Sequence, residues 1–500
     1  MIGFIKKTAA KIWAKNHVKQ TEYYKNNAEQ LQEKLLLDMV KSAEKTLFGL
    51  QHNFSEIKSV EDFQKNVKIC DYEDLKPFIE KIKHGDKNIL WQEKPEYFAK
   101  TSGTTSGTKY IPLTKEGMDY QVKAAQSALF HYIAQKNNAD FVNGKMIFLQ
   151  GSPELEDKNG IKTGRLSGIV AHHIPKYLQK NRLPSYETNC IEDWETKVDK
   201  IVEETEKENM TLISGIPPWL IMYFEKLIER NGKKIKQLFP NLQLIVTGGV
   251  NYEPYREKME ELLGGKVDII QTFPASEGFF AFQDDYEKEG LLLQSNHGIF
   301  YEFIPLELYG KPDAPRLTLK EVELNKDYAL ILTTNSGLWA YSIGDVVRFI
   351  SKNPHRILVS GRTKHFTSAF GEHVIAFEVE EAMKATVEKF PAQITEFHLA
   401  PQVNPENGEL PYHEWFIEFE KEPENLEDFR QNLDAEMRKR NTYYDDLIAG
   451  NILQVLKITK LQKNAFQEYA KSEGKLGGQN KIPRLANDRK IGDFLKNFKI

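Results

Sequence analysis

The pattern of hydrophobic and polar positions divides the chain into three parts. Up to about residue 83, apolar residues recur at helical spacing among lysines and glutamates, which predicts a mostly helical leader. From Met146 the pattern changes to short apolar runs that alternate with charged segments of helical period. This alternation predicts a mostly parallel sheet with helices on its faces, whose ligands bind beyond the carboxyl ends of the strands. The expected strands are 146–150, 211–216, 242–250 and 267–273, and the expected helices are 194–208, 219–230 and 255–263.

The third part follows Arg362 and has a different rhythm. It predicts a helix over 376–389, a strand over 414–419 and a helix over 426–439, which together make a small α+β domain. We therefore expect an α/β fold with a large N-terminal domain of βαβ subdomains, residues 1–361, and a small mobile C-terminal domain, residues 362–500. The hinge is expected just after Gly361 and Arg362.

Composition and charge exclude several classes of function. The chain has 500 residues, too many for one core, and its net charge of −4 offers no electrostatic case for nucleic acid as a partner. Cys70 and Cys190 are far apart and lack the spacing of metal ligands. We expect both to be free thiols of a reducing compartment, which indicates a cytoplasmic protein.

The first 20 residues are apolar at about helical spacing, with lysines between. They lack the uninterrupted apolar core and small-residue cleavage site of a signal peptide, and no run in the chain approaches the roughly 20 apolar residues that insert stably into a membrane. A basic amphipathic helix could lie on a membrane surface. We expect instead that its Ile/Phe/Trp face packs on the body of the protein.

The densest cluster of ligand-binding chemistry is the segment TSGTTSGTKY, residues 101–110. Its glycines allow positive φ and its hydroxyls and N–H groups can donate to phosphate oxygens, so it predicts a phosphate cradle rather than a helix or a buried strand. It departs from the common P-loop because three residues separate Gly103 from Gly107 and Thr108 precedes Lys109. The alternative is a surface loop without special chemistry.

Two strand ends carry further polar or small residues. Ser276 and Glu277 follow the strand 267–273, and a carboxylate in such a turn fits a ligand to a magnesium ion that bridges nucleotide phosphates. The preceding strand ends at Gly248 and Gly249, where missing side chains would leave a slot for a flat ring. The alternative for each is an ordinary turn.

Two more segments complete the candidate set. In YSIGDVVRFI, residues 341–350, Asp345 interrupts an apolar strand, and the two hydroxyls of a ribose would be a fitting partner for its carboxylate. It could equally be an exposed edge residue or pair with Arg348. In the tail, Lys481 lies in a loose glycine-rich segment, which is either a solvated loop or the tip of a small domain that closes over phosphates.

These motifs occur in the order of a known family. The chain resembles the auxin-responsive (GH-three) family of acyl-acid amido synthetases, within the adenylate-forming superfamily that includes acyl-CoA ligases and luciferases. The resemblance covers nearly the whole chain. It runs from an entry segment through a phosphate motif, a second and a third motif to a lysine segment, which are 69–90, TSGTTSGTKY, FPASE, YSIGDV and QNKIPR.

The resemblance implies a role for each motif residue. Ser102, Thr104, Thr105 and Ser106 would hold the β- and γ-phosphates of ATP with the backbone of Gly103 and Gly107. Glu277 would bind Mg²⁺, and Lys481 would be the catalytic lysine of the mobile domain. The other residues implied at the nucleotide are Thr108, Gly248, Gly249, Val250, Phe273, Ser276, Asp345 and Arg362. Phe273 stands where the family usually has a tyrosine, and Pro274 and Ala275 replace small and serine residues.

The implied reaction has two steps. A small carboxylic acid attacks the α-phosphate of ATP, pyrophosphate leaves, and an amine, expected to be an amino acid, then gives an amide and AMP. An acyl-CoA ligase, a non-catalytic nucleotide-binding protein and a simple ATPase are the alternatives. The acyl pocket is expected around 165–186 and after Gly215, with His172 and His173 structural and Arg165 in a surface ion pair or on a substrate carboxylate. The acid, the amine and the oligomeric state do not follow from the sequence.

Overall fold

The computed structural model describes most of the chain: residues 2–102, 108–174, 179–191, 193–249, 252, 255–363, 366–367, 374–403, 405, 409–449, 453–474, 482–486 and 488–500. It divides into two compact units, one of Met1–Gly249 with Lys266–Leu358, the other of Val250–Gly265 with Val359–Ile500. The predicted domain boundary after residue 361 lies three residues beyond the second division. The sequence pattern did not indicate that 250–265 groups with the C-terminal unit.

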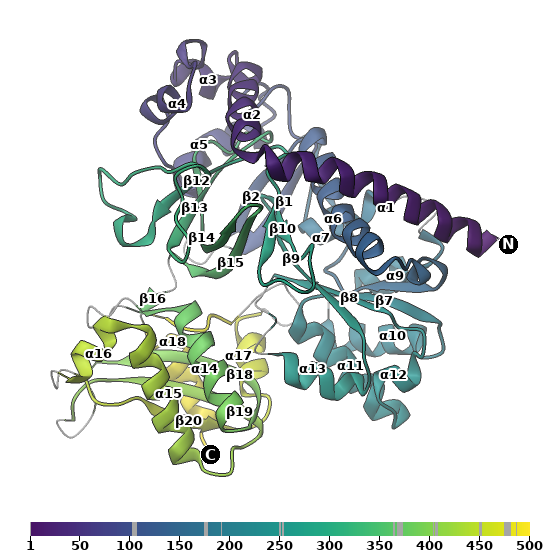
Figure 1. Cartoon of the computed structure of the whole chain (residues 1–500), viewed down its shortest axis with the longest axis vertical. Coiled ribbons are helices and arrows are strands. Elements are labelled where there is room, and N and C mark those ends of the chain that lie inside the picture. The colour runs from purple at the N-terminus through teal and green to yellow at the C-terminus, as the bar shows by residue number, and fades with distance from the viewer. Residues whose placement is uncertain are drawn as a thin grey trace. The chain divides into compact units, whose positions relative to one another are not determined.

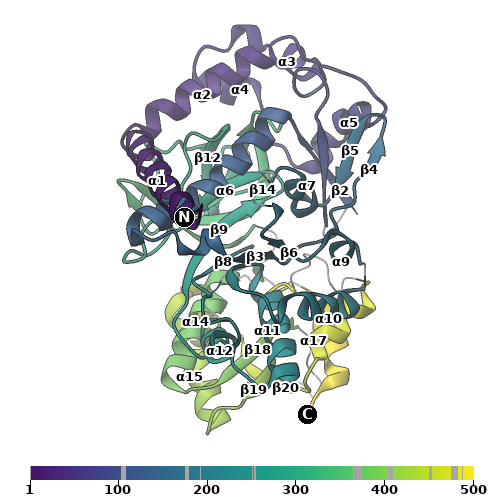
Figure 2. The same cartoon turned by 90° about the vertical axis from the view of Figure 1, so that its right-hand side faces the viewer.

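The leader of the larger unit is helical, as predicted. Its helices are α1 (Ile2–Asn26), α2 (Ala28–Ala43), α3 (Leu47–Gln51), α4 (Val60–Asn66) and α5 (Tyr72–Lys83), with a 3₁₀ turn η1 (Phe54–Glu56). Local chemistry fixes their starts: the side chain of Ser59 accepts from the amide of Asp62, and Asp71 and Asp74 form a capping box at α5. α1 runs along α6 (Lys115–Lys136), as Figures 1 and 2 show. None of the described helices is long and apolar enough to cross a bilayer.

The predicted packing of α1 is wrong. Phe4, Ile5, Ile12 and Trp13 are exposed, whereas Ala14 is fully buried. The sequence pattern located the apolar residues but not the side of the helix that packs, because small residues line its other side.

An eleven-stranded sheet forms the centre of the larger unit. One half is parallel, in the order β9-β8-β7-β3-β6, and confirms the predicted β-α-β alternation. Figure 2 shows α6 on one side of β8 and β9, and α10 and α11 on the other. The elements of this half are β3 (Lys145–Phe148), β6 (Arg182–Leu183), β7 (Met210–Ser214), β8 (Leu244–Gly248), β9 (Asp268–Ala275), α7 (Leu166–His172), α9 (Tyr186–Cys190), α10 (Trp194–Thr205), α11 (Pro217–Asn231), α12 (Ile235–Leu238) and η2 (Asp140–Asn143).

The other half of this sheet is antiparallel, in the order β12-β13-β14-β15-β11-β10, and continues from β9. Its strands are β10 (Gly278–Phe282), β11 (Leu291–Leu293), β12 (Ile299–Pro305), β13 (Asp327–Thr334), β14 (Tyr341–Lys352) and β15 (His355–Arg362), with a 3₁₀ turn η4 (Leu306–Leu308). A separate four-stranded sheet has the order β2-β1-β5-β4 and contains β1 (Tyr97–Ser102), β2 (Thr108–Leu113), β4 (Glu156–Lys158) and β5 (Ile161–Gly164).

The smaller unit is the predicted α+β fold. The three expected elements are present as α14 (Ala376–Lys389), β19 (Tyr412–Lys421) and α15 (Leu426–Arg440), and α14 and α15 cover a sheet of order β18-β19-β20 through a shared apolar core. Its other elements are β16 (Phe366–Thr367), β17 (Val374–Ile375), β18 (Gln393–Gln402), β20 (Lys457–Leu461), α16 (Thr442–Ala449), α17 (Ala465–Ser472), α18 (Lys490–Leu495) and η6 (Lys496–Phe498). Helix α13 (Arg256–Leu263), which joins β8 to β9 in the chain, contacts β18.

Candidate active site

The predicted phosphate-binding segment joins two paired strands. Ser102 of β1 lies opposite Thr108 of β2, and the antiparallel register continues to Tyr97 and Leu113. The ends of the segment are therefore strand, which the sequence analysis did not expect. Its central residues lie outside the described part of the chain, as do Val250 and Lys481, and of Ser102, Thr108 and Arg362 only the backbone is described. These central residues are Gly103, Thr104, Thr105, Ser106 and Gly107.

Ser276 and Glu277 form the two-residue turn between β9 and β10, where Ala275 pairs with Gly278. Their predicted place, in a turn at the carboxyl end of a sheet strand, is confirmed. A Cβ at Gly278 would lie 2.3 Å from Cδ1 of Ile299, so packing leaves only a hydrogen at this position. The carbonyl of Ser276 accepts a hydrogen bond from Gln121 of α6 over 3.5 Å. The turn is thus fixed from both sides.

The charge of Glu277 acts on Tyr341, the first residue of β14. The pKa of the Tyr341 hydroxyl is raised, first by burial and next by the negative charge of Glu277. Cys70 holds the same strand start, because its amide donates to the carbonyl of Ala340 over 3.1 Å and its carbonyl accepts from Ser342 over 2.8 Å. Both cysteines are free, and burial raises the pKa of the Cys70 thiol. The two backbone hydrogen bonds of Cys70 therefore hold the start of β14 in place.

Asp345 sits in a β-bulge of β14. Ala329 of β13 pairs with Val346 and Ile331 pairs with Ser342, so three residues of β14 face one of β13 between these pairs. Gly344 within the bulge has φ of 86°, a conformation that favours glycine. Bulges re-aim side chains and are frequent beside active sites. The Gly-Asp interruption in the sequence is thus the signature of this bulge.

Arg348, which the sequence offers as a possible partner of Asp345, binds the carboxylate of Asp327. Arg348 donates from Nε and Nη2 to the two oxygens of Asp327 over 3.0 and 2.5 Å. Asp327 is its direct cross-strand neighbour in β13. The positive charge of Arg348 is therefore compensated within the sheet by a bidentate pair.

Packing and backbone conformation explain why two glycines stand at the end of β8. A Cβ at Gly248 would lie 2.4 Å from Oγ1 of Thr272, and Gly249 has φ of 80°. The space beside Gly248 is thus filled by the neighbouring strand rather than left as a slot. Phe273 is buried and packs edge-on against Phe280, with ring centroids 5.0 Å apart. Contact of these residues with an adenine ring stays a prediction.

Three family models match the chain in sequence order. The GH3 family N-terminal domain matches residues 17–191, the central domain 292–362 and the C-terminal domain 377–490. The chain belongs to the GH3 family.

The relatives are distant in sequence, and some of them match nearly the whole chain. The probable indole-3-acetic acid-amido synthetase GH3.1 of Arabidopsis thaliana is 22% identical over 94% of this chain and 91% of its own. The solved AtGH3.15 acyl acid amido synthetase in complex with 2,4-DB is 18% identical, with a TM-score of 0.79 over 97% of this chain and 96% of its own. A 2-hydroxyisobutyryl-CoA ligase in the postadenylation state, in complex with 2-HIB-AMP, has a TM-score of 0.62 at 12% identity, over 94% and 91%. These similarities place the fold among adenylate-forming ligases.

The residues that follow Lys481 in this GH3 family chain are fixed to β18. Leu399 of β18 donates its amide to the carbonyl of Arg484 over 2.8 Å and accepts from Ala486 over 3.1 Å, and His398 donates to the carbonyl of Pro483 over 2.7 Å. The glycine-rich composition of this tail predicts a loose segment, whereas residues 483–486 are held by hydrogen bonds to β18. The proline and arginine after Lys481 were the available signals of order.

Arg484 itself was missed as a buried ion-pair centre. Its Nε donates to Glu380 over 3.2 Å, its Nη2 donates to the hydroxyl of Tyr255 over 2.8 Å, and Nη1 pairs with Glu396. Its side chain is 9% exposed. The four residues come from α14, β18, the start of α13 and the tail, so Arg484 holds these segments of the smaller unit together.

A second residue that the sequence pattern did not single out is the buried Lys197 of α10, which lies between the two segments expected to form the acyl pocket. Its ammonium donates to the carbonyls of Gln150 and Asn189 over 3.1 and 2.6 Å, and burial lowers its pKa to about 8. Arg165 is exposed and forms no ion pair with another residue that the structure describes, so the expected surface pair is absent there. His172 donates to the carbonyl of Pro153 over 2.8 Å, and His173 shares a hydrogen bond with Tyr97, which fits their structural interpretation.

The described residues contain no group of three or more His, Cys, Asp or Glu that could hold a metal ion. Glu277 alone fits the way magnesium binds nucleotides, because Mg²⁺ takes one or two carboxylates and completes its shell with phosphate oxygens and water.

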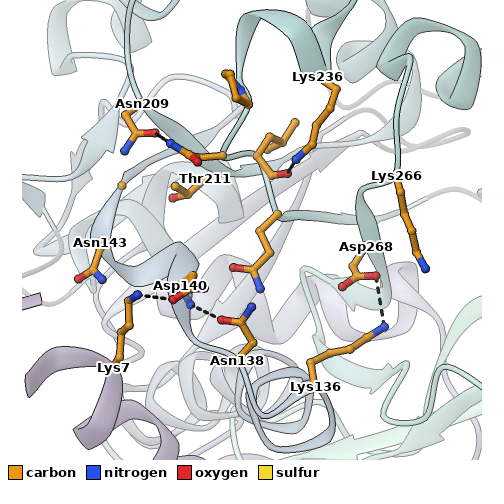
Figure 3. Close-up of a pocket in the computed structure, with 15 residues that line it drawn as sticks. Lys7, Lys136, Asn138, Asp140, Asn143, Asn209, Thr211, Lys236, Lys266 and Asp268 are labelled. Atoms are coloured by element: carbon orange, nitrogen blue, oxygen red, sulfur yellow. Dashed lines mark hydrogen bonds and ion pairs between the residues drawn. The ribbon is translucent and has the colours of Figure 1, made fainter. Parts of the chain in front are cut away.

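A hollow of about 670 Å³ lies at the opposite edge of the sheet, at the amino ends of β7, β8 and β9 (Figure 3). Most of its lysines are already engaged. Lys7 pairs with Asp140, Lys136 with Asp268 over 3.3 Å, and Lys236 donates to the carbonyl of Leu242 over 2.5 Å. Because ligands of such sheets bind at the carboxyl ends, this hollow is not the nucleotide site.

Proposed function

We propose that this chain is an ATP-dependent acyl-acid amido synthetase. It adenylates a small carboxylic acid with release of pyrophosphate, and transfers the acyl group to an amine, an amino acid, to give an amide and AMP. Three GH3 family domains in order support the proposal, as do relatives named for amido synthesis.

One structural observation carries the proposal for this chain. Glu277 occupies the turn between β9 and β10, and Asp345 occupies a bulge of β14. Both carboxylates lie where the regular strand geometry is interrupted, one in a turn and one in a bulge. They suit a metal-bound triphosphate and a ribose.

Each candidate residue then has a task at the bound nucleotide. Asp345 accepts hydrogen bonds from the ribose hydroxyls, and Phe273 with the backbone of 248–250 borders the adenine. The residues that we assign to the phosphates are Ser102, Gly103, Thr104, Thr105, Ser106, Gly107, Thr108 and Ser276, with Arg362 at the hinge. Glu277 holds Mg²⁺, which neutralises charge on the phosphates when bound.

The reaction needs no side-chain nucleophile. The substrate carboxylate attacks the α-phosphorus in line, the bond to the pyrophosphate oxygen breaks, and the amine then attacks the acyl carbon and displaces AMP. The barrier is lowered by positioning and by charge stabilisation from oriented N–H groups and from Lys481. Closure of the C-terminal domain gates the two steps. The free cysteines support a reducing compartment, and we propose the cytoplasm.

The test is identification of the product. The chain is incubated with ATP, magnesium, a panel of aromatic and aliphatic carboxylic acids, an amino-acid mixture and coenzyme A, and products are read by mass spectrometry. An acid-dependent amide with AMP is the expected result. A thioester instead of an amide identifies an acyl-CoA ligase, and release of phosphate without acid dependence identifies an ATPase, so either result rejects the proposal.

A further inference from the structure

Helix α1 is attached to the larger unit by one side only. Ala14 on that side is fully buried against the core that contains Ala124 and Ala128 of α6. His17 shares a 2.8 Å hydrogen bond with the hydroxyl of Ser127, and its ring lies 5.2 Å from that of Phe130. Small residues, a histidine and the ion pairs of Lys7 with Asp140 and of Lys25 with Asp284 therefore make the attachment, and the four exposed apolar side chains described next take no part in it.

The opposite side of α1 is exposed and carries large apolar side chains among the polar residues Thr8, Asn16 and Gln20. Phe4, Ile5, Ile12 and Trp13 are 75%, 60%, 54% and 58% exposed. At 100° per residue, Ile5 and Ile12 point directly away from Ala14, with Phe4 and Trp13 on either side of them. Five of the twelve large hydrophobic residues exposed in the described part of the chain belong to this helix, the fifth being Tyr23. Such clustering marks an interaction surface.

Lysines lie within and beside this surface. Around the helix, Lys15 and Lys19 lie between Phe4 and Ile12, and Lys6 lies next to Trp13; all three are exposed. None of them forms an ion pair with another residue that the structure describes. Residues 2–21 contain no Asp or Glu. Lys7 differs, because it lies on the attached side and pairs with Asp140.

We propose that this outward side of α1 binds the surface of a membrane that contains anionic lipids. Phe, Ile and Trp side chains would enter the boundary between head groups and acyl chains, while lysines at the same depth as the phosphates would attract negative lipid charge. A tryptophan suits this boundary because its ring is apolar and its N–H is polar. The helix would lie in the plane of the surface. This inference is independent of the proposed ligase activity.

The test is sedimentation of the full chain with vesicles. The wild-type chain is expected to bind vesicles of phosphatidylcholine with phosphatidylglycerol at least about tenfold more tightly than phosphatidylcholine alone, since each exposed lysine contributes about fivefold. The triple variant Ile5→Ser, Ile12→Ser, Trp13→Ser should lose more than about tenfold of this binding. Lys6→Gln, Lys15→Gln, Lys19→Gln together should abolish the preference for anionic vesicles. Leu50→Ser, an equally exposed apolar residue outside α1, is the matched control and should bind as wild type.

Tryptophan fluorescence gives a second readout. Vesicles should shift the emission of the wild-type chain to shorter wavelength, and Trp13→Phe should keep the binding but lose most of the shift. Failure of the wild-type chain to bind anionic vesicles overturns the proposal. It is also overturned if the triple serine variant instead lowers the molar mass measured by light scattering, because the surface would then be an interface between copies of the chain.

Discussion

Arg484 donates a hydrogen bond of 2.8 Å from Nη2 to the hydroxyl of Tyr255, a residue 229 positions earlier in the chain. Tyr255 follows the glycines at the end of β8, which we assign to the adenine, and Arg484 follows the assigned lysine, Lys481, by three residues. The smaller unit therefore contains both the tail of the chain and the segment that leads away from Gly249. A hydrogen bond within one folded unit thus connects the segment that follows Lys481 with the segment that follows Gly249.

This arrangement predicts a large cost for Arg484→Met. The substitution leaves the carboxylates of Glu380 and Glu396 buried without their cation, and we expect the free energy of unfolding to fall by about 3–5 kcal/mol. Arg438→Met is the control, because Arg438 and its partner Asp445 are both more than one third exposed and the loss should be under about 1 kcal/mol. Urea unfolding of both variants checks this, and equal losses would show that the Arg484 cluster contributes no more than a surface pair.

A second prediction concerns the metal. Glu277→Gln keeps the size of the side chain but removes its charge, so adenylation should fall at least about a hundredfold, or about 2.7 kcal/mol in barrier. Glu289→Gln, an exposed residue after β10, should leave adenylation unchanged. Adenylation by Glu277→Gln within about tenfold of wild type would remove Glu277 from the site.

The third prediction separates Asp345 from the neighbouring carboxylate. Asp345→Asn should weaken ATP binding about tenfold, since one of the acceptors for the ribose hydroxyls becomes an amide donor. Asp327→Asn breaks the bidentate pair with Arg348 and should lower stability without changing ATP affinity. Calorimetric titration with ATP distinguishes the two, and equal ATP affinity in both variants would assign Asp345 a structural role.

The fourth prediction is a pH dependence of stability. Burial lowers the pKa of His131 from 6.5 to about 4, with its ring 5.0 Å from Phe282. Below pH 6.5 the unfolded chain takes up a proton that the native state refuses, so stability is lost as pH falls from about 6.5 toward 4. The loss attributable to His131 is about 2 kcal/mol by pH 5, and His131→Phe should remove most of it.

His84 provides the matched control for this measurement. Its Nδ1 donates to the carbonyl four residues earlier, as that of His131 does, but its side chain is exposed. His84→Phe should therefore leave the acid limb of the unfolding curve unchanged. An unchanged acid limb in His131→Phe would mean that the ring protonates in the native state as easily as in water.

The sequence predicted the features that depend on local periodicity. The parallel strands, the helical leader, α14 and α15, and the turn at Glu277 all follow from patterns within about fifteen residues. The packed side of α1 did not, because the alanines and histidine of one side and the isoleucines and tryptophan of the other give the same pattern of apolar spacing. Which side is buried depends on α6, more than one hundred residues away.

Parts of the candidate site could not be predicted for the same reason, because they depend on contacts between distant segments. Arg484 meets residues from three distant segments, and Lys197 meets the carbonyls of Gln150 and of Asn189 in α9, so neither side chain carries a signal in the residues next to it. The bulge at Asp345 was readable from its glycine, but its register is set by β13. The sequence predicts a slot for a ligand ring at Gly248, whereas close contact with the adjacent Thr272 already explains why this residue is a glycine.

The most direct test of the proposed function is ATP–pyrophosphate exchange measured with magnesium and single carboxylic acids, in the absence of any amine. Reversible adenylation predicts exchange that requires one or a few acids and disappears in Glu277→Gln. Absence of exchange across a broad acid panel, with ATP binding intact, would contradict adenylation and identify the chain as a nucleotide-binding protein without this activity.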